Sequence, residues 1–361
     1  MKIRFVLLVI FSAMIFSCKT SQPENITDGN KDSIPNNTDI TFAKGADISW
    51  LPQMEASGYK FYNSKGIQED CIKILKDNGI NSIRLRTWVT PSDHKQNGHC
   101  SKEETVAMAI RAKNAGLRIM IDFHYSDSWA DPSKQVKPKA WEGHNFTQLQ
   151  QDVYDYTADV MKALKNKNIT PEWVQTGNEI PSGMIYPDGY LFKESGKEDW
   201  HSLATLINRG YDAVKAVSST SKVILHIDQG NDNGRFRWWF DNAVKYGMKF
   251  DIIGMSYYPY WLAGTHPDYT LSINDLGNNL KDMVSRYGKE VMVVETGGED
   301  TKTQNTYDML KAVIEKVQAI PDGRGLGVFY WEPEGARSWS NYPLSAWGNN
   351  GKPTKALEAF K

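Results

Sequence analysis

Two glutamates each close a short hydrophobic run with the character of a buried strand. Glu179 ends the segment Trp173–Glu179, and Glu295 ends the segment Glu290–Glu295. A carboxylate at the carboxyl end of a buried parallel strand is costly to desolvate and useful for chemistry. If both strands belong to one barrel, the two acids face one cleft, where one can protonate a leaving oxygen while the other attacks an anomeric carbon. The pair therefore predicts cleavage of glycosidic bonds.

The rest of the chain contains the elements that such a barrel needs. Eight strand-like segments recur, at Phe42–Ile48, Ile80–Trp88, Leu117–Phe123, Glu172–Thr176, Lys222–Ile227, Asp251–Ser256, Val291–Val294 and Gly325–Tyr330. Helical periodicity lies between them, at Ile67–Asn78, from the capping box Ser101–Glu104 to just before Gly116, and at Val153–Leu164, Leu203–Val217, Ile273–Tyr287 and Thr306–Val317. This alternation predicts one (β/α)8 TIM barrel over residues 41–361. An open doubly wound sheet is the alternative, but the first strand is not followed by a Gly-rich phosphate turn.

Polar and aromatic residues follow all eight segments, as an active site at one end of a barrel requires. The candidates beside the two glutamates are Asp47, Arg84, His124, Trp129, Asn178, Asp228, Tyr257 and Trp331. We expect Arg84 or Arg86, which share one face of their strand, to keep a nucleophilic carboxylate ionised by Coulomb attraction, and Tyr257 to donate a hydrogen bond to it. His124 and Asn178 are suited to holding sugar hydroxyls.

Composition excludes some classes of partner. The net charge of −1 gives no basic footprint for nucleic acid. The 12 Trp and 17 Tyr include many in Gly- and Pro-rich segments, where ring faces can stack on sugars. Core packing explains the same aromatics equally well. A polysaccharide substrate and a monomeric protein are the expectations.

The first 40 residues predict export. Lys2 and Arg4 precede an apolar run, Phe5–Phe16, that is too short to span a membrane. The run ends Ile-Phe-Ser-Cys18, which resembles a bacterial lipobox, so residues 1–18 are predicted to be a lipoprotein signal peptide ending at an acylated Cys18. Residues 19–40 have the composition of a flexible tether. The protein is therefore expected in the bacterial cell envelope, at the outer membrane or cell surface, with its lipid as the only membrane contact; plain secretion is the alternative.

The remaining cysteines and the acidic loops leave two questions open. An exported location allows a disulfide between Cys71 and Cys100, but two free buried thiols fit the sequence equally well. No His/Cys cluster has zinc spacing. The Asp/Asn-rich segment Asp228–Gly234 lacks the closing glutamate of a calcium loop, so it is expected to form a loop beside the substrate.

Several segments from residue 42 onwards are similar, in order, to those of one known family. They are Lys44–Ser49, Gly79–Trp88, His124–Pro132, Thr176–Ile180, His226–Asp228, Ser256–Pro259, Val293–Thr296 and Tyr330–Pro333. On these segments the chain resembles glycoside hydrolase family 53, the endo-β-1,4-galactanases (arabinogalactan endo-β-1,4-galactosidases). The resemblance implies an endo-acting, retaining hydrolase of β-1,4-galactan in the type I arabinogalactan side chains of pectin.

The resemblance also implies roles for individual residues. Glu179 corresponds to the general acid/base, and Glu295 to the nucleophile that forms a covalent galactosyl ester before water releases the sugar. Arg84, Asn178 and Tyr257 correspond to residues around the nucleophile or its sugar, and Asp47, His124, Trp129, Asp228 and Trp331 correspond to the cleft lining. No metal or cofactor is implied, although calcium stays open because some relatives carry it in a longer loop after the nucleophile.

Three other functions compete with this one. A surface glycan-binding protein on an inactive barrel fits the predicted lipid anchor. An aldolase or phosphosugar isomerase would use Gly297-Gly298 as a phosphate loop, but no strand ends in a lysine placed for a Schiff base. A related hydrolase of mannan, xylan or cellulose would need the same two glutamates.

Overall fold

The computed structural model describes residues 42–361, except residue 195 and residues 263–267. The predicted signal peptide, the acylated Cys18 and the tether therefore lie outside the described residues. Among the described residues, no helix is long and apolar enough to cross a membrane.

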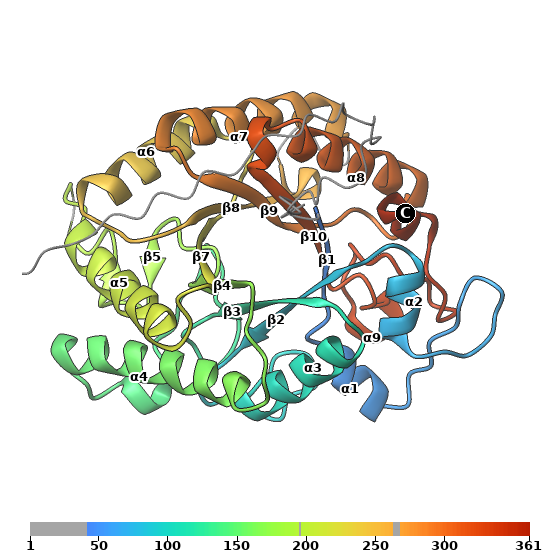
Figure 1. The fold of residues 1–361 in the computed structure, drawn as a ribbon, viewed down its shortest axis with the longest axis horizontal. Helices are drawn as coiled ribbons and strands as arrows, with labels where there is room; N and C mark the ends of the chain where they lie inside the picture. The colour runs from blue at the N-terminus through green and yellow to red at the C-terminus, as the bar shows by residue number, and fades with distance from the viewer. Residues whose placement is uncertain (1–41, 195, 263–267) are drawn as a thin grey trace, which may run out of the picture. The chain divides into compact units, whose positions relative to one another are not determined.

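Eight parallel strands close into a barrel, and helices surround it (Figure 1). The strands are β1 (Ala43–Asp47), β2 (Ser82–Thr87), β3 (Arg118–Phe123), β4 (Trp173–Thr176), β7 (Lys222–Ile227), β8 (Ile252–Tyr257), β9 (Glu290–Thr296) and β10 (Gly325–Trp331). They pair in chain order, and β1 also pairs with β10, so that Ala43 lies opposite Gly327 and Asp47 opposite Trp331. The predicted (β/α)8 barrel is confirmed, with each strand within a few residues of its expected position.

Two apolar layers hold the barrel together. Its interior is filled by side chains such as Met120, Trp173 and Phe329, and a larger cluster packs between the strands and the outer helices. Gly45 on β1 has to be a glycine because a Cβ atom there would lie 2.1 Å from the Phe329 ring. The interior is thus a packed core, which leaves the strand ends as the place for a site.

The helices are α1 (Leu51–Ala56), α2 (Cys71–Asp77), α3 (Lys102–Asn114), α4 (Phe146–Lys165), α5 (Trp200–Val217), α6 (Asn233–Lys245), α7 (Ile273–Tyr287), α8 (Thr303–Gln318) and α9 (Arg337–Ser340). The capping box of Ser101 and Glu104 is confirmed at the start of α3. Helix α2 begins at Cys71 rather than at Ile67, because the Asp70 side chain caps it by accepting from the Lys73 amide.

Helices α1, α6 and α9 and a small hairpin were not predicted. Helix α6 follows the Asp/Asn-rich segment, and the Asp232 side chain caps it. A small antiparallel hairpin, β5 (Gly183–Met184) with β6 (Gly189–Tyr190), interrupts the connection from β4 to α5.

The structure also distinguishes between the two alternatives for the cysteines. Cys71 and Cys100 are both buried, free thiols.

Candidate active site

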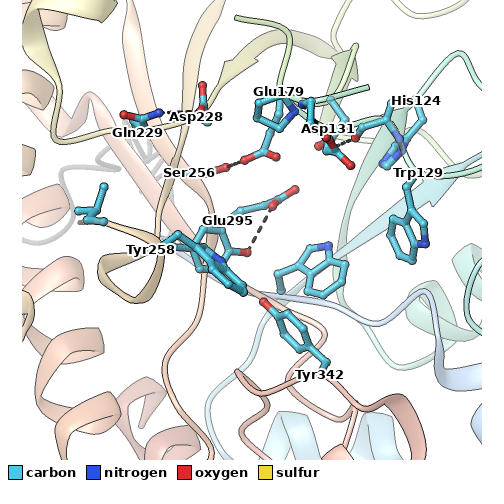
Figure 2. Close-up of a pocket in the computed structure, with 17 residues that line it drawn as sticks. His124, Trp129, Asp131, Glu179, Asp228, Gln229, Ser256, Tyr258, Glu295 and Tyr342 are labelled. Carbon is cyan, nitrogen blue, oxygen red and sulfur yellow. Dashed lines mark hydrogen bonds between the residues drawn. The ribbon is translucent and has the colours of Figure 1, made fainter. Parts of the chain in front are cut away.

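A cleft of about 770 Å³ lies at the carboxyl ends of the strands, and Glu179 and Glu295 both line it (Figure 2). Its other lining residues include His124, Trp129, Asp131, Asn178, Asp228, Gln229, Ser256, Tyr258, Trp261, Trp331 and Tyr342. Residues from both halves of the chain therefore meet here because the barrel closes between β1 and β10.

Glu179 sits in the turn after β4 and has no cationic partner among the described residues. Its backbone takes a left-handed conformation, with φ of 43°, and the Ser256 hydroxyl donates to its Oε1 at 2.6 Å. Burial raises the pKa of Glu179 well above its usual value, and the nearby carboxylates of Glu295 and Asp228 raise it further. These surroundings favour the protonated acid.

Glu295 lies on β9 in contrasting surroundings. Arg84 Nη2 is 2.8 Å from its Oε1. The Tyr258 hydroxyl donates to its Oε2 at 3.3 Å, as the dashed line in Figure 2 marks. Burial raises the pKa of Glu295 to about 7, while the Arg84 charge pulls it down. Of the two glutamates, Glu295 is thus the one that ionises first.

Arg84, on β2, is the centre of a buried network. Its guanidinium donates to Asp47 at 2.9 Å and to Asp122 at 2.8 Å, in addition to its contact with Glu295. It also donates to Gln175 Oε1 at 2.6 Å and to Asn178 Oδ1 at 2.8 Å. The arginine is only 1% exposed, so these contacts are made away from water and hold Glu295 in one orientation.

A second chain of hydrogen bonds holds Glu179. Burial lowers the pKa of His226 well below its usual value, so its ring is neutral. His226 Nε2 lies 2.7 Å from the Ser256 hydroxyl, which itself donates to Glu179, so Nε2 carries the ring proton and donates it to Ser256. His226 Nδ1 then accepts from Gln175 Nε2 at 2.9 Å. Gln175 touches both Arg84 and His226, so it joins the two networks.

Comparison with known proteins identifies the family of this chain. The family model for "Glycosyl hydrolase family 53" matches residues 43–360. The chain belongs to glycosyl hydrolase family 53.

Two relatives and two solved structures show how similar the chain is to other members of this family. The chain is 34% identical over 317 residues to the endo-β-1,4-galactanase of Bacillus subtilis (strain 168), covering 81% of this chain and 70% of that protein. It is 32% identical to an arabinogalactan endo-β-1,4-galactanase of Thermothelomyces thermophilus, covering 80% and 89%. A GH53 catalytic domain of Ignisphaera aggregans superposes with a TM-score of 0.80 at 29% identity, over 91% and 97% of the chains. A fungal β-1,4-galactanase structure gives 0.78 at 30% identity, over 88% and 98%.

The family 53 barrel places most of the predicted site residues together. His124, Trp129, Asn178, Asp228 and Trp331 line the cleft with the two glutamates. Arg84 and Asp47 lie behind it, with Arg84 holding Glu295 and Asp47 holding Arg84. Asp228 accepts from Arg235 Nη2 at 2.6 Å, in the predicted substrate-side loop.

The prediction for Tyr257 is wrong. Its side chain is fully buried, and its hydroxyl lies 2.8 Å from Ser272 Oγ, behind the barrel wall. The next residue, Tyr258, lines the cleft and donates to Glu295 instead. The two-residue alternation along β8 continues to this end of the strand. Met255 and Tyr257 face the outer core, whereas Ser256 and Tyr258 face the cleft.

The neighbouring tyrosines give a matched test. We expect Tyr258→Phe to lower kcat by about tenfold or more, because the hydroxyl that steadies the Glu295 carboxylate is lost. Tyr257→Phe is expected to lower only stability, by about 1 kcal/mol, because its hydroxyl bonds within the fold. Steady-state kinetics and thermal unfolding of both variants check this pair, and a larger loss of kcat in Tyr257→Phe would contradict the assignment.

Reasoning from sequence also missed several residues of the site. Gln175, His226, Ser256 and Tyr342 were not among the candidates, yet they hold or surround the two glutamates. The alternation along β4 and β7 could have indicated Gln175 and His226, since both are buried polar residues near strand ends. Within the part of the chain that the structure describes, no three His, Cys, Asp or Glu side chains gather as a metal site.

Proposed function

We propose that the cleft hydrolyses internal β-1,4-galactosidic bonds of galactan, including the type I arabinogalactan side chains of pectin. The observation that carries the proposal is the asymmetry of the two cleft glutamates: Arg84 contacts Glu295, whereas Glu179 has only a hydroxyl donor. Membership of family 53 and the names of the relatives supply the substrate.

The asymmetry assigns the steps of a retaining reaction. The Glu295 carboxylate attacks the anomeric carbon while Glu179 donates its proton to the departing glycosidic oxygen, which leaves a galactosyl ester on Glu295. Glu179, now ionised, takes a proton from water, and the water oxygen bonds to the anomeric carbon while the ester bond to Glu295 breaks. The sugar leaves with a free anomeric hydroxyl, Glu179 is again protonated, and Glu295 is again a carboxylate.

Ring faces in the cleft suit a neutral sugar chain. Trp129, Trp331 and Tyr342 line one part of it, and Trp261, whose surface is 61% exposed, lines another. Apolar C–H faces of pyranose rings stack on such rings, whereas a phosphosugar would need cationic side chains. This lining favours a polysaccharide hydrolase over an aldolase or isomerase.

The decisive experiment measures reducing-sugar release by the domain from residue 41. The substrates are linear β-1,4-galactan, mannan, xylan and carboxymethylcellulose. Release from galactan alone is the expected result, and release from another polymer would move the assignment to that substrate. Retention on a galactan affinity gel without any hydrolysis would favour the glycan-binding alternative.

Asp228 is the residue at which galactose recognition can be tested. A carboxylate fixed by Arg235 at the cleft edge can accept from an axial hydroxyl that distinguishes galactose from its epimer. Asp228→Ala is expected to lower kcat/KM on galactan by at least about tenfold, because a site built to bond a hydroxyl loses its partner. Asp241→Ala, on the outer face of α6, is the control. A wild-type rate for Asp228→Ala would remove Asp228 from the site.

The pH dependence follows from the two pKa shifts. The active form needs Glu295 ionised and Glu179 protonated, so kcat/KM should rise with pH through about 7, the raised pKa of Glu295, and fall only where Glu179 ionises. With an aryl galactoside whose leaving group needs no proton, Glu179→Gln should lose the alkaline limb and keep the acid limb. Loss of the acid limb instead would reverse the two roles.

The predicted cellular setting is part of the same proposal. We propose that the chain is exported, lipid-anchored through Cys18 in the bacterial cell envelope, and monomeric. The support is the sequence of residues 1–40, and labelling of the full chain with a fatty-acid analogue, compared with Cys18→Ala, tests it.

A further inference from the structure

The strand ends gather more carboxyl groups than cations. Six carboxyls (Asp47, Asp122, Glu179, Glu295, Glu332 and Glu334) share two buried arginines, Arg84 and Arg86. Four of the six lie in ion pairs with these arginines. Among the described residues, the two without an ion pair are Glu179 and Glu334. Glu179 is the proposed acid, so Glu334 is the group for which the mechanism gives no role.

Glu334 is completely buried and does not line the cleft. Neither of its carboxylate oxygens has a donor among the described residues. The Glu332 carboxyl, two residues earlier, is close enough for its charge and a shared hydrogen bond to raise the pKa of Glu334. Two ionised carboxylates cannot share a hydrogen bond, so this contact requires a proton.

The proton belongs to Glu334 because Glu332 already acts as an anion. Both Glu332 oxygens accept from the Trp50 backbone N–H, at 3.1 and 3.2 Å, and Arg86 Nη1 pairs with one of them. We propose that Glu334 is a positioning residue that stays protonated and donates to Glu332. It thereby fixes the tryptophan wall of the cleft, which consists of Trp129 and Trp331.

Glu332 is connected to the tryptophan wall through Arg86 and Trp50, both of which it contacts. The Arg86 guanidinium lies 4.4 Å from the Trp129 ring centroid, and the Trp50 ring packs edge-on against Trp331 at 5.1 Å. Trp129 and Trp331 both line the cleft, and their centroids are 5.7 Å apart. A second negative charge at Glu334 would compete for Arg86 and loosen both contacts. The consequence for sugar binding rests on the proposed function, but the proton itself does not.

The charged groups that act on Glu334 are carboxylates, since Arg86 is paired with Glu332. Glu332 and Asp47 are acidic, and the Cys71 and Cys100 thiols stay neutral because burial raises their pKa values. Burial and the Glu332 charge raise the pKa of Glu334 well above its usual value. A raised pKa makes the protonated form the stabilising one, so its contribution is present at low pH and is lost as pH rises through that value.

Infrared spectroscopy detects this proton without any activity. In a Glu179→Gln background, which removes the catalytic acid, the protein should retain a protonated-carboxyl C=O band at a pH above the titration of Glu295 and Glu332. Adding Glu334→Gln should abolish that band, since the amide still donates to Glu332. An unchanged spectrum, or no band in the background variant, would overturn the proposal whatever the substrate.

Kinetics then test the positioning role. Glu334→Gln should keep the wild-type KM for galactan, whereas Glu334→Ala should raise KM by about tenfold with kcat little changed, because the wall binds sugar but does not react. Glu103→Ala, at a position that is 74% exposed on α3, is the matched control. A wild-type KM in Glu334→Ala would overturn the role. If Glu334→Ala does not fold, a KM for Glu334→Gln above the wild-type value would overturn the positioning role instead.

Discussion

Replacement of Glu295 by alanine is expected to lower galactan hydrolysis by about 10⁴-fold or more, and replacement of Glu179 by about 10²- to 10⁴-fold. The first change removes the group that bonds to the sugar, and the second leaves the departing oxygen without a proton. The cleft should otherwise survive, because the barrel core lies below it and neither side chain is part of that core. Circular dichroism of both variants provides the control.

Azide separates the two roles. In Glu295→Ala, azide can enter the vacated space and attack the anomeric carbon directly, giving an α-galactosyl azide from an aryl β-galactoside. In Glu179→Ala, the ester on Glu295 forms first and azide opens it, giving the β product. Nuclear magnetic resonance of the products distinguishes the anomers. The same anomer from both variants would contradict the retaining mechanism.

Arg84→Met is expected to cost more stability than any other change considered, and to lower activity as well. It leaves the nearly buried Asp47, Asp122 and Glu295 without their shared cation. Removing one partner of a buried ion pair costs about 3–5 kcal/mol, and here three carboxylates lose theirs. The pKa of Glu295, freed from the Arg84 charge, should rise further, so the acid limb of the pH profile should move to higher pH.

Urea unfolding and the pH profile of kcat/KM measure these effects. The control is Arg237→Ala, which breaks a solvent-exposed pair with Asp282 on the outer helices and should change stability little. Equal losses of stability in the two variants would show that the buried contacts of Arg84 stabilise the fold no more than an exposed ion pair does. An unshifted acid limb in Arg84→Met would mean that another group sets the ionisation of Glu295.

The sequence predicts the barrel and its two glutamates because both depend on local patterns. Buried parallel strands are apolar on both faces, and their ends are marked by polar residues. Glu179, Glu295 and Arg84 stand out because they lie at or near the ends of such strands. Two-residue counting along β8 gives Tyr258, not Tyr257, as the tyrosine that shares the cleft face with Ser256. The register shift lies on β9 instead, where Val294 in the barrel interior is followed directly by Glu295 in the cleft, and nothing in the sequence of that strand records it.

The buried acid pair could not be predicted for a different reason. Glu332 and Glu334 flank Pro333 just after β10 and have the composition of an ordinary polar turn. Their burial is created by partners far away in the chain, Trp50 and Arg86. A sequence pattern reports the periodicity of one segment, whereas desolvation is a property of the whole assembly. The lack of a cation beside Glu334 among the described residues is likewise a property of the fold and not of its own segment.

The pairing of β1 with β10 has a consequence for how the enzyme is made. The first strand pairs early with β2 but finds its second neighbour, β10, only after the last strand has been synthesised, so the sheet keeps two open edges through most of translation. Contacts between such distant segments form slowly, and the unpaired edges are prone to aggregate. Arg84 emerges early and Glu295 late, so a nascent chain has the cation long before the nucleophile. Catalytic turnover should therefore appear only with the completed fold, and a chain truncated before Gly325 should be both inactive and insoluble.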